Sequence, residues 1–302
     1  MWFDPVVVER VGELLPTWLA VLMVVLSYLG SVYLIAPAAV AAYWRWRDLV
    51  APMLGGIVGC YGLMSITKSY HTASRPTVDP PIGAEVFPLP LVPLFEHAAH
   101  IDTTSFPSGH ALAATIIVGM LVVELPVSSL PKRALVGAGV VGWVGLTRVG
   151  LGVHYPGDVV GGVAYGLAFL ALFYLARRLL TRHPSVDAPT AAFAVGLAVG
   201  TVALAYVGSR NAHVVFGAGL GGLLAWRVAP AAADRLGDSV WGYVLPLVGV
   251  VAVGLTWVVT ELGIGGNTFL VAWSALFLVA IVLVPWVRTV RYTGQLEHHH
   301  AD

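Results

Sequence analysis

Long apolar runs alternate with short polar links along most of this chain. About 20 apolar residues in a helix cross the hydrocarbon core of a bilayer, and loops between such runs stay polar. Nine runs meet this requirement, at roughly residues 16–44, 49–67, 109–126, 133–151, 158–176, 189–208, 212–229, 239–260 and 267–287. The pattern predicts an all-α, polytopic membrane protein with about nine transmembrane helices, preceded by a short interfacial helix over 3–14.

Composition agrees with a membrane protein. Hydrophobic residues make up 58% of the chain and charged residues only 11%, and the mean hydropathy is +0.84, which excludes an ordinary soluble domain. The lone Cys60 cannot form an intramolecular disulfide. We therefore expect the bilayer, and no nucleic acid, as a partner. The sequence leaves the oligomeric state open.

The polar residues divide the chain into three predicted regions. Residues 1–183 form a five-helix membrane core, residues 184–290 add four helices of unknown role, and residues 291–302 form a tail whose LEHHH resembles part of an expression tag. Within the core, the loop 69–106 is unusually long and carries five prolines between Pro80 and Pro93. Loops of this length inside a compact fold are commonly functional, so we expect a partial lid on the membrane surface.

Basic residues are unevenly distributed between the two sides of the predicted bundle. Eleven Lys and Arg residues follow the odd-numbered spans or the last one, and five lie on the opposite side. Because cytoplasmic loops are enriched in Lys and Arg, the sequence predicts a cell-membrane protein with its N-terminus outside. Lys68, His110, Arg148 and Asp158 then all lie at span ends on the extracytoplasmic face.

Three polar blocks contain these residues. They are Lys68 with Arg75-Pro76, then Pro107-Ser108-Gly109-His110, and finally Arg148 with His154 and Asp158. Ionisable residues at membrane depth are costly and mark functional sites. Two arginines bind phosphate oxygens bidentately and a lysine acts as a point charge, while Ser108 and Gly109 at a helix start supply N–H groups and a positive dipole end. The blocks predict a phosphate site.

The third block also contains a candidate nucleophile. Pro156 disfavours a continuous helix through His154, so we expect His154 in a turn and Asp158 in the first helical turn. If Asp158 accepts the Nδ1 proton, Nε2 is free to attack phosphorus, and His110 can protonate the departing oxygen. Because no Asp/Glu cluster suited to Mg²⁺ accompanies the blocks, we expect no metal and no cofactor.

Together, the three blocks resemble the type 2 phosphatidic acid phosphatase superfamily, membrane lipid-phosphate phosphatases that share their site with vanadium haloperoxidases. The resemblance covers about residues 50–176. It implies His154 as nucleophile, Asp158 as its orienting group and His110 as acid. It also implies five phosphate ligands, which are Lys68, Arg75, Arg148, Ser108 and Gly109. Thr147 stands where the family usually has serine. Because threonine also has a hydroxyl group, we expect it to make the hydrogen bond that the serine makes in the family.

The resemblance implies metal-independent hydrolysis of a membrane lipid phosphate or diphosphate at the outer leaflet, through a phosphohistidine. Polyprenyl or dolichyl diphosphate, phosphatidate and phosphatidylglycerophosphate all present the required group. One alternative is a lipid phosphotransferase that uses the same phosphohistidine. Another is a lipid-binding or transport protein without activity, which the complete set of site residues disfavours.

Other polar residues are weaker candidates. Taken singly, Lys68 is typical of a span-end lysine and Ser108 of a helix N-cap. The loop residues near the blocks are best interpreted as a solvated lid, with headgroup contact as the alternative; they are His71, Glu96, His97, His100 and Asp102. A headgroup pocket in the C-terminal region is a further hypothesis, resting on Arg210, His213, Glu261 and Asn267.

Overall fold

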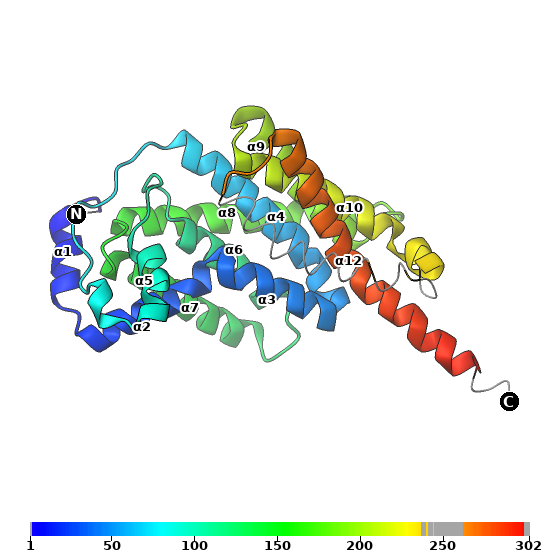
Figure 1. The fold of residues 1–302 in the computed structure, drawn as a ribbon, viewed down its shortest axis with the longest axis horizontal. Coiled ribbons are helices and arrows are strands. Elements are labelled where there is room, and N and C mark those ends of the chain that lie inside the picture. The colour runs from blue at the N-terminus through cyan, green and yellow to red at the C-terminus, as the bar shows by residue number, and fades with distance from the viewer. Residues whose placement is uncertain (1, 237–239, 241–243, 245–261, 299–302) are drawn as a thin grey trace. The chain divides into compact units, whose positions relative to one another are not determined.

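A computed structural model describes residues 2–236, 240, 244 and 262–298, and all regular elements in these residues are helical (Figure 1). The α-helices are α1 (Pro5–Glu13), α2 (Thr17–Ser27), α3 (Val32–Arg45), α4 (Arg47–Tyr70), α5 (Val92–Ala99), α6 (Gly109–Glu124), α7 (Leu130–Gly150), α8 (Pro156–Leu180), α9 (Ala188–Tyr206), α10 (Arg210–Leu236) and α12 (Asn267–His298). Three short 3-10 helices join them, η1 (Tyr28–Gly30), η2 (Ala84–Val86) and η3 (Leu89–Leu91). The predicted all-α class is confirmed.

The predicted number of nine membrane spans is not confirmed. Among the described residues, four helices are long and apolar enough to cross a membrane: α4, α8, α9 and residues Arg210–Ala229 of α10. There is a fifth candidate if α1 and Thr17–Gly30 count as one broken span, with a bend of 118° between the two segments. Helix α6 and residues Asn267–Leu283 are apolar but shorter. Apart from residues 240 and 244, the predicted span 239–260 lies outside the described residues.

The first predicted span, 16–44, is not one helix. The chain forms α2, turns through η1, and starts α3 at Val32 after an extended Ser31. The turn is set by packing, because a Cβ on Gly30 would lie 2.7 Å from the carbonyl oxygen of His110. Only glycine allows the backbone to approach this closely. Thus one apolar run yields two helices, with the break beside the second polar block.

The chain divides into two compact units, and the first contains all three polar blocks. Unit 1 comprises Met1–Ala38 and Ile66–Tyr174. In this unit α6 packs closely on α8, since a Cβ at Gly162 would overlap Ser108 and one at Gly166 would overlap Thr115. This packing brings the start of α6 to the start of α8, where Asp158 lies. The predicted boundary at 183/184 differs from this division and stays a prediction.

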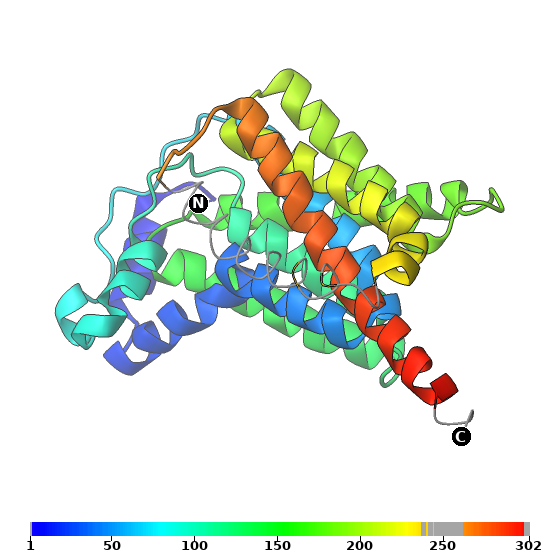
Figure 2. The same ribbon diagram turned by 45° about the vertical axis from the view of Figure 1, so that its right-hand side comes forward.

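Unit 2 comprises Ala39–Ser65 and Leu175–Asp302. Glycines again permit close helix contacts: a Cβ on Gly55 would overlap the backbone of Ala192, and one on Gly221 would overlap Ala275. Helices α10 and α12 lie side by side in both ribbon views (Figures 1 and 2). Helix α12 continues to His298, so much of the predicted tail is helical.

The long loop 69–106 is ordered by apolar packing. Helix α5 within it lies beside α2 (Figures 1 and 2), and Phe95 is buried in a cluster with Met23, Val24 and Leu151. The Tyr28 hydroxyl donates to the carbonyl oxygen of Leu94 at 2.9 Å. The predicted lid therefore contains a helix that is anchored to unit 1.

Candidate active site

A buried histidine–aspartate pair lies at the junction of α7 and α8. His154 lies in the turn before α8, and Asp158 lies in the first turn of that helix, as predicted. The His154 Nδ1 is 3.2 Å from the Asp158 Oδ2, and both residues are almost completely inaccessible to solvent. The backbone N–H of Tyr155 also donates to Oδ2, at 2.9 Å. The carboxylate is thus placed to fix the imidazole with Nδ1 protonated and Nε2 turned away.

Arg75 faces the other nitrogen of this imidazole. Its Nη1 is 3.2 Å from the His154 Nε2 and donates to the carbonyl oxygen of Val153 at 2.6 Å. Its Nε donates to the carbonyl oxygen of Thr103 at 2.7 Å. Burial lowers the pKa of Arg75 to about 10, against the attraction of Asp158 and Asp102. The guanidinium is therefore still cationic at neutral pH. It lies next to the Nε2 atom, where it could bind the oxygens of a phosphate attached to that atom.

Lys68 reaches the same region from the end of α4. Its ammonium donates to the carbonyl oxygens of Thr104 and Ser105, the latter at 3.2 Å. In return the Thr104 hydroxyl donates to the carbonyl oxygen of Lys68 at 3.2 Å. Lys68 and Arg75 thus hold one segment, residues 103–105, between them. This segment directly precedes the second polar block.

Arg148 is fully buried in the last turn of α7. Its Nη2 donates to the carbonyl oxygen of Ala98 on α5 at 2.6 Å. Its Nε and Nη1 have no hydrogen-bond partner among the described residues. Buried polar groups are nearly always hydrogen-bonded, so two N–H-bearing atoms without a protein partner indicate an anion-binding role.

The second block begins helix α6. The Ser108 side chain accepts from the N–H of Ala111 at 3.5 Å, and its own N–H donates to the Asp158 carbonyl oxygen at 2.9 Å. Ser108 is therefore an N-cap whose amide is already used, while Gly109 starts the helix. His110 follows in the first turn, within electrostatic reach of Arg148 and His154. The structure thus brings all eight predicted residues into unit 1.

The electrostatic setting favours a neutral His154. Burial lowers the pKa of His154 well below the usual value for an imidazole. The hydrogen bond with Asp158 opposes this shift, whereas the positive charges of Arg75, Arg148 and Lys68 add to it. A histidine that is neutral at physiological pH keeps the lone pair that nucleophilic attack requires.

Ser105 was missed by the sequence analysis. Its side chain is fully buried, donates to the Asp158 Oδ2 and lies 3.5 Å from the His154 Nδ1. Ser105 stands two residues before Pro107 in a run of small polar residues, a pattern typical of any loop. The only signal for Ser105 in the sequence is its closeness to the second polar block, and many loop serines share that feature.

Other predictions about individual residues had mixed outcomes. The Thr147 hydroxyl donates within its own helix to the carbonyl oxygen of Val144 at 2.7 Å, so its donor proton is not directed to a ligand. In unit 2, Arg210 donates to the carbonyl oxygens of Ile264 and Gly265, and His213 bonds the Ser209 carbonyl oxygen at 2.8 Å. Glu261 lies outside the described residues.

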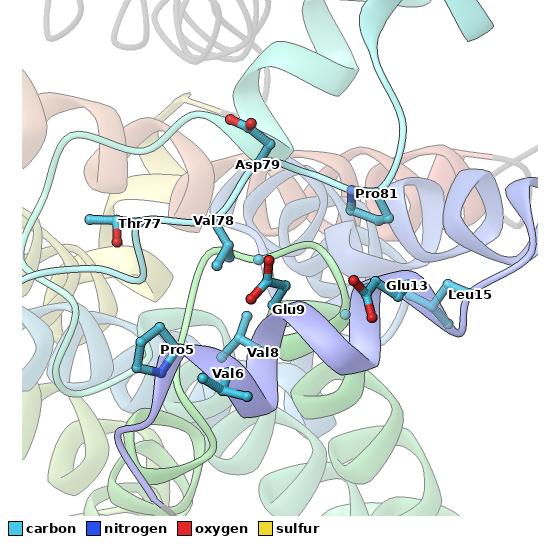
Figure 3. A pocket seen from close by; sticks show the side chains of 13 residues that line it. Pro5, Val6, Val8, Glu9, Glu13, Leu15, Thr77, Val78, Asp79 and Pro81 are labelled. Atoms are coloured by element: carbon cyan, nitrogen blue, oxygen red, sulfur yellow. The ribbon is translucent and has the colours of Figure 1, made fainter.

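A pocket of about 630 Å³ in unit 1 is not lined by any of the predicted site residues (Figure 3). Helix α1 and the segment 77–81 form its walls, and Glu9, Glu13 and Asp79 supply carboxylates. Clustered carboxylates repel phosphate, which argues against this pocket as the phosphate site. Within the described part of the chain, no group of three or more His, Cys, Asp or Glu side chains is arranged to hold a metal.

These features define a helical membrane protein with a buried histidine–aspartate pair surrounded by fixed cations. Residues 49–182 match the family model of the PAP2 superfamily, which confirms the resemblance that the three blocks carry. That match includes all eight predicted residues.

Two curated relatives are similar to this chain. Phosphatidylglycerophosphatase B of Bacillus subtilis is 41% identical over 91 residues, which are 28% of this chain and 43% of the relative. Lipid A 1-phosphatase of Rhizobium etli is 29% identical over 170 residues, 54% of this chain and 68% of that protein. The chain thus spans less than half of the Bacillus relative. Both relatives are lipid phosphatases, and together with the apolar helices they indicate a multi-pass membrane protein.

One solved structure is also similar, that of a transmembrane PAP2 type phosphatidylglycerolphosphate phosphatase from Bacillus subtilis. It has a TM-score of 0.44 and 24% sequence identity, covering 56% of this chain and 81% of that one.

Proposed function

We propose that this protein is a lipid-phosphate phosphohydrolase that acts through a phosphohistidine. The observation that carries the proposal is the buried His154–Asp158 pair with Arg75 at the free nitrogen. Covalent catalysis needs a nucleophile that is held in one orientation, and Asp158 holds His154 in this way. Relatives that are lipid phosphatases support the same class of reaction.

In the first step the His154 Nε2 attacks phosphorus and the bond from phosphorus to the leaving oxygen breaks. His110 gives a proton to that oxygen, and the lipid alcohol or phosphate leaves. Asp158 stabilises the imidazolium, while Lys68, Arg75 and Arg148 stabilise the phosphoryl oxygens, with Ser108 and Gly109 at the helix start. In the second step His110 takes a proton from a water molecule, the water oxygen attacks phosphorus, and the bond from phosphorus to Nε2 breaks. Inorganic phosphate is released, His154 is again neutral and His110 is again protonated.

The setting of this reaction is also part of the proposal. We propose about nine spans, an external N-terminus and a site at the outer leaflet of the cell membrane, which the uneven distribution of Lys and Arg along the sequence supports. The three fixed cations supply the charge stabilisation that a metal supplies in other phosphatases. We therefore expect activity without any added metal, on a lipid mono- or diphosphate.

The test is phosphate release by purified protein in detergent from a panel of lipid mono- and diphosphates, with and without EDTA. We expect release in EDTA, and loss of at least 1000-fold in His154→Ala, as is common when a nucleophile is removed. Full activity of His154→Ala would refute the mechanism. Labelled phosphate that appears on an added alcohol, with little in water, would instead identify a phosphotransferase.

A further inference from the structure

Helix α5 and the turn η1 place an additional histidine beside the proposed acid. The turn η1 contacts both histidines: the ring of Tyr28, its first residue, lies 6.3 Å from the ring of His97 on α5, measured between centroids, and Gly30, its last residue, packs on the His110 backbone. The two imidazoles are also close enough to interact electrostatically. His97 is exposed, unlike the nucleophile. An accessible imidazole next to a proposed acid is in a position to contact substrate.

The position of His97 is held from three directions. Its ring packs edge-on against Tyr33, with 4.5 Å between ring centroids. Tyr28 fixes the preceding turn of α5 through the Leu94 carbonyl oxygen. Arg148 fixes the next residue, Ala98, through its carbonyl oxygen at 2.6 Å. The helix that carries His97 is thus tied directly to a proposed phosphate ligand.

The location of His97 beside His110 puts it near the leaving group of the substrate. In an in-line displacement the nucleophile and the leaving oxygen lie on opposite sides of phosphorus. Because His110 is the proposed donor to the leaving oxygen, a side chain beside His110 meets the leaving group. Histidine donates hydrogen bonds and becomes cationic on protonation, and the nearby Arg148 adds positive charge. This environment favours anionic oxygens.

We propose that His97, oriented by Tyr33, binds a second phosphoryl group carried by the leaving group of the substrate. The inference rests on the proposed function, and it selects among its substrates. A lipid diphosphate carries the second phosphoryl directly on the leaving oxygen. Phosphatidylglycerophosphate carries it as a phosphodiester on the glycerol. Phosphatidate has no second phosphoryl group, and neither does a prenyl monophosphate.

Two matched substrate pairs test this assignment. One pair is farnesyl diphosphate and farnesyl monophosphate, and the other is phosphatidylglycerophosphate and phosphatidate with the same acyl chains. The measured quantity is the ratio of kcat/KM within each pair, for the full-length protein in detergent. We expect His97→Ala to lower at least one ratio by about tenfold, the loss typical of one charge-assisted hydrogen bond. The pair affected identifies whether the second group is a diphosphate or a phosphodiester.

Two further variants separate binding from packing. His97→Phe keeps an aromatic ring against Tyr33 but has no N–H, so it should lose discrimination as fully as His97→Ala. His100→Ala removes an exposed histidine that pairs with Glu96 at 2.7 Å, three residues further along, and should keep both ratios. Unchanged ratios in His97→Ala, or ratios restored in His97→Phe, would overturn the assignment. Absence of phosphate release by the unaltered protein would instead overturn the proposed function itself.

Discussion

Replacing Ser105 with alanine removes one hydrogen bond from the proposed catalytic pair and leaves its members in place. The Ser105 hydroxyl is one of three donors to the Asp158 Oδ2, with the His154 Nδ1 and the Tyr155 N–H. Its side chain bonds Asp158 and lies beside His154, whereas its bond with Lys68 is made by the backbone carbonyl oxygen and is kept in alanine. The substitution therefore tests whether the environment of the carboxylate matters for the reaction.

The size of the effect follows from the charge of the acceptor. A hydrogen bond to a charged group contributes roughly 1.5–3 kcal/mol. If the whole of this loss is felt in the transition state, kcat falls by about 10- to 150-fold. KM should change little, because the hydroxyl is fully buried and is bonded to Asp158. The carboxylate also loses a competing donor, so its negative charge acts more fully on His154 and raises the pKa of His154.

The assay is phosphate release at saturating lipid over a range of pH, combined with thermal unfolding in detergent. We expect lower kcat, and an acid limb of the pH profile moved to higher pH. Ser274→Ala is the matched control, since Ser274 is equally buried but donates to the Leu270 carbonyl oxygen in unit 2. The reasoning is wrong if Ser105→Ala loses activity only in proportion to folded protein, with the pH profile unmoved.

Three other outcomes follow from the site and the packing. The pKa of His154 is lowered chiefly by burial and also by the nearby cations. Activity should therefore persist as the pH falls below ~6.5, the pKa of a free imidazole, and decline only at lower pH. A decline centred at the pKa of a free imidazole would contradict this. Arg75→Lys keeps the charge but loses the planar set of donors to Thr103 and Val153, so kcat/KM should fall by about 10-fold or more, and equal activity would show that charge alone suffices. Gly55→Val places side-chain atoms into the backbone of Ala192, and should lower the unfolding temperature in detergent by an amount equivalent to about 1–3 kcal/mol, while the exposed Gly139→Val, with open space around it, changes it far less.

The helices that are long apolar runs between clear breaks were predictable from sequence. Helices α8 and α9 begin within a few residues of the predicted positions because Pro156 and Asp187 mark their starts. The break at Gly30 was not predicted, although Ser27, Gly30 and Ser31 interrupt the run 16–44, which is longer than the roughly 20 residues that one span needs. It is determined by contact with His110, and a single sequence does not contain that distance.

The candidate site shows the same limit. Lys68 and Arg148 could be singled out because a charge at the end of an apolar run is unusual enough to require an explanation, and Arg75 because it stands in the same polar block as Lys68. Ser105 was not, because a serine in a loop is ordinary. The role of α5 also depends on a backbone carbonyl, that of Ala98, which bonds Arg148. Every residue has a backbone carbonyl, so a contact of this kind cannot be predicted from the identity of the residue.

Folding of unit 1 gathers three like charges around one imidazole, and this has a consequence for the life of the protein in the membrane. Cations that repel one another, among them a buried Arg148 with two atoms lacking a protein partner, make the unliganded fold less stable than an apolar version of it would be. An anion that binds only the folded state stabilises it by RT ln(1 + [L]/Kd), roughly 2.7 kcal/mol at a hundred times Kd. Inorganic phosphate, the product of the proposed reaction, would then also act as a stabilising ligand, so that conditions favouring the longest-lived protein are also those in which its site is most occupied by product.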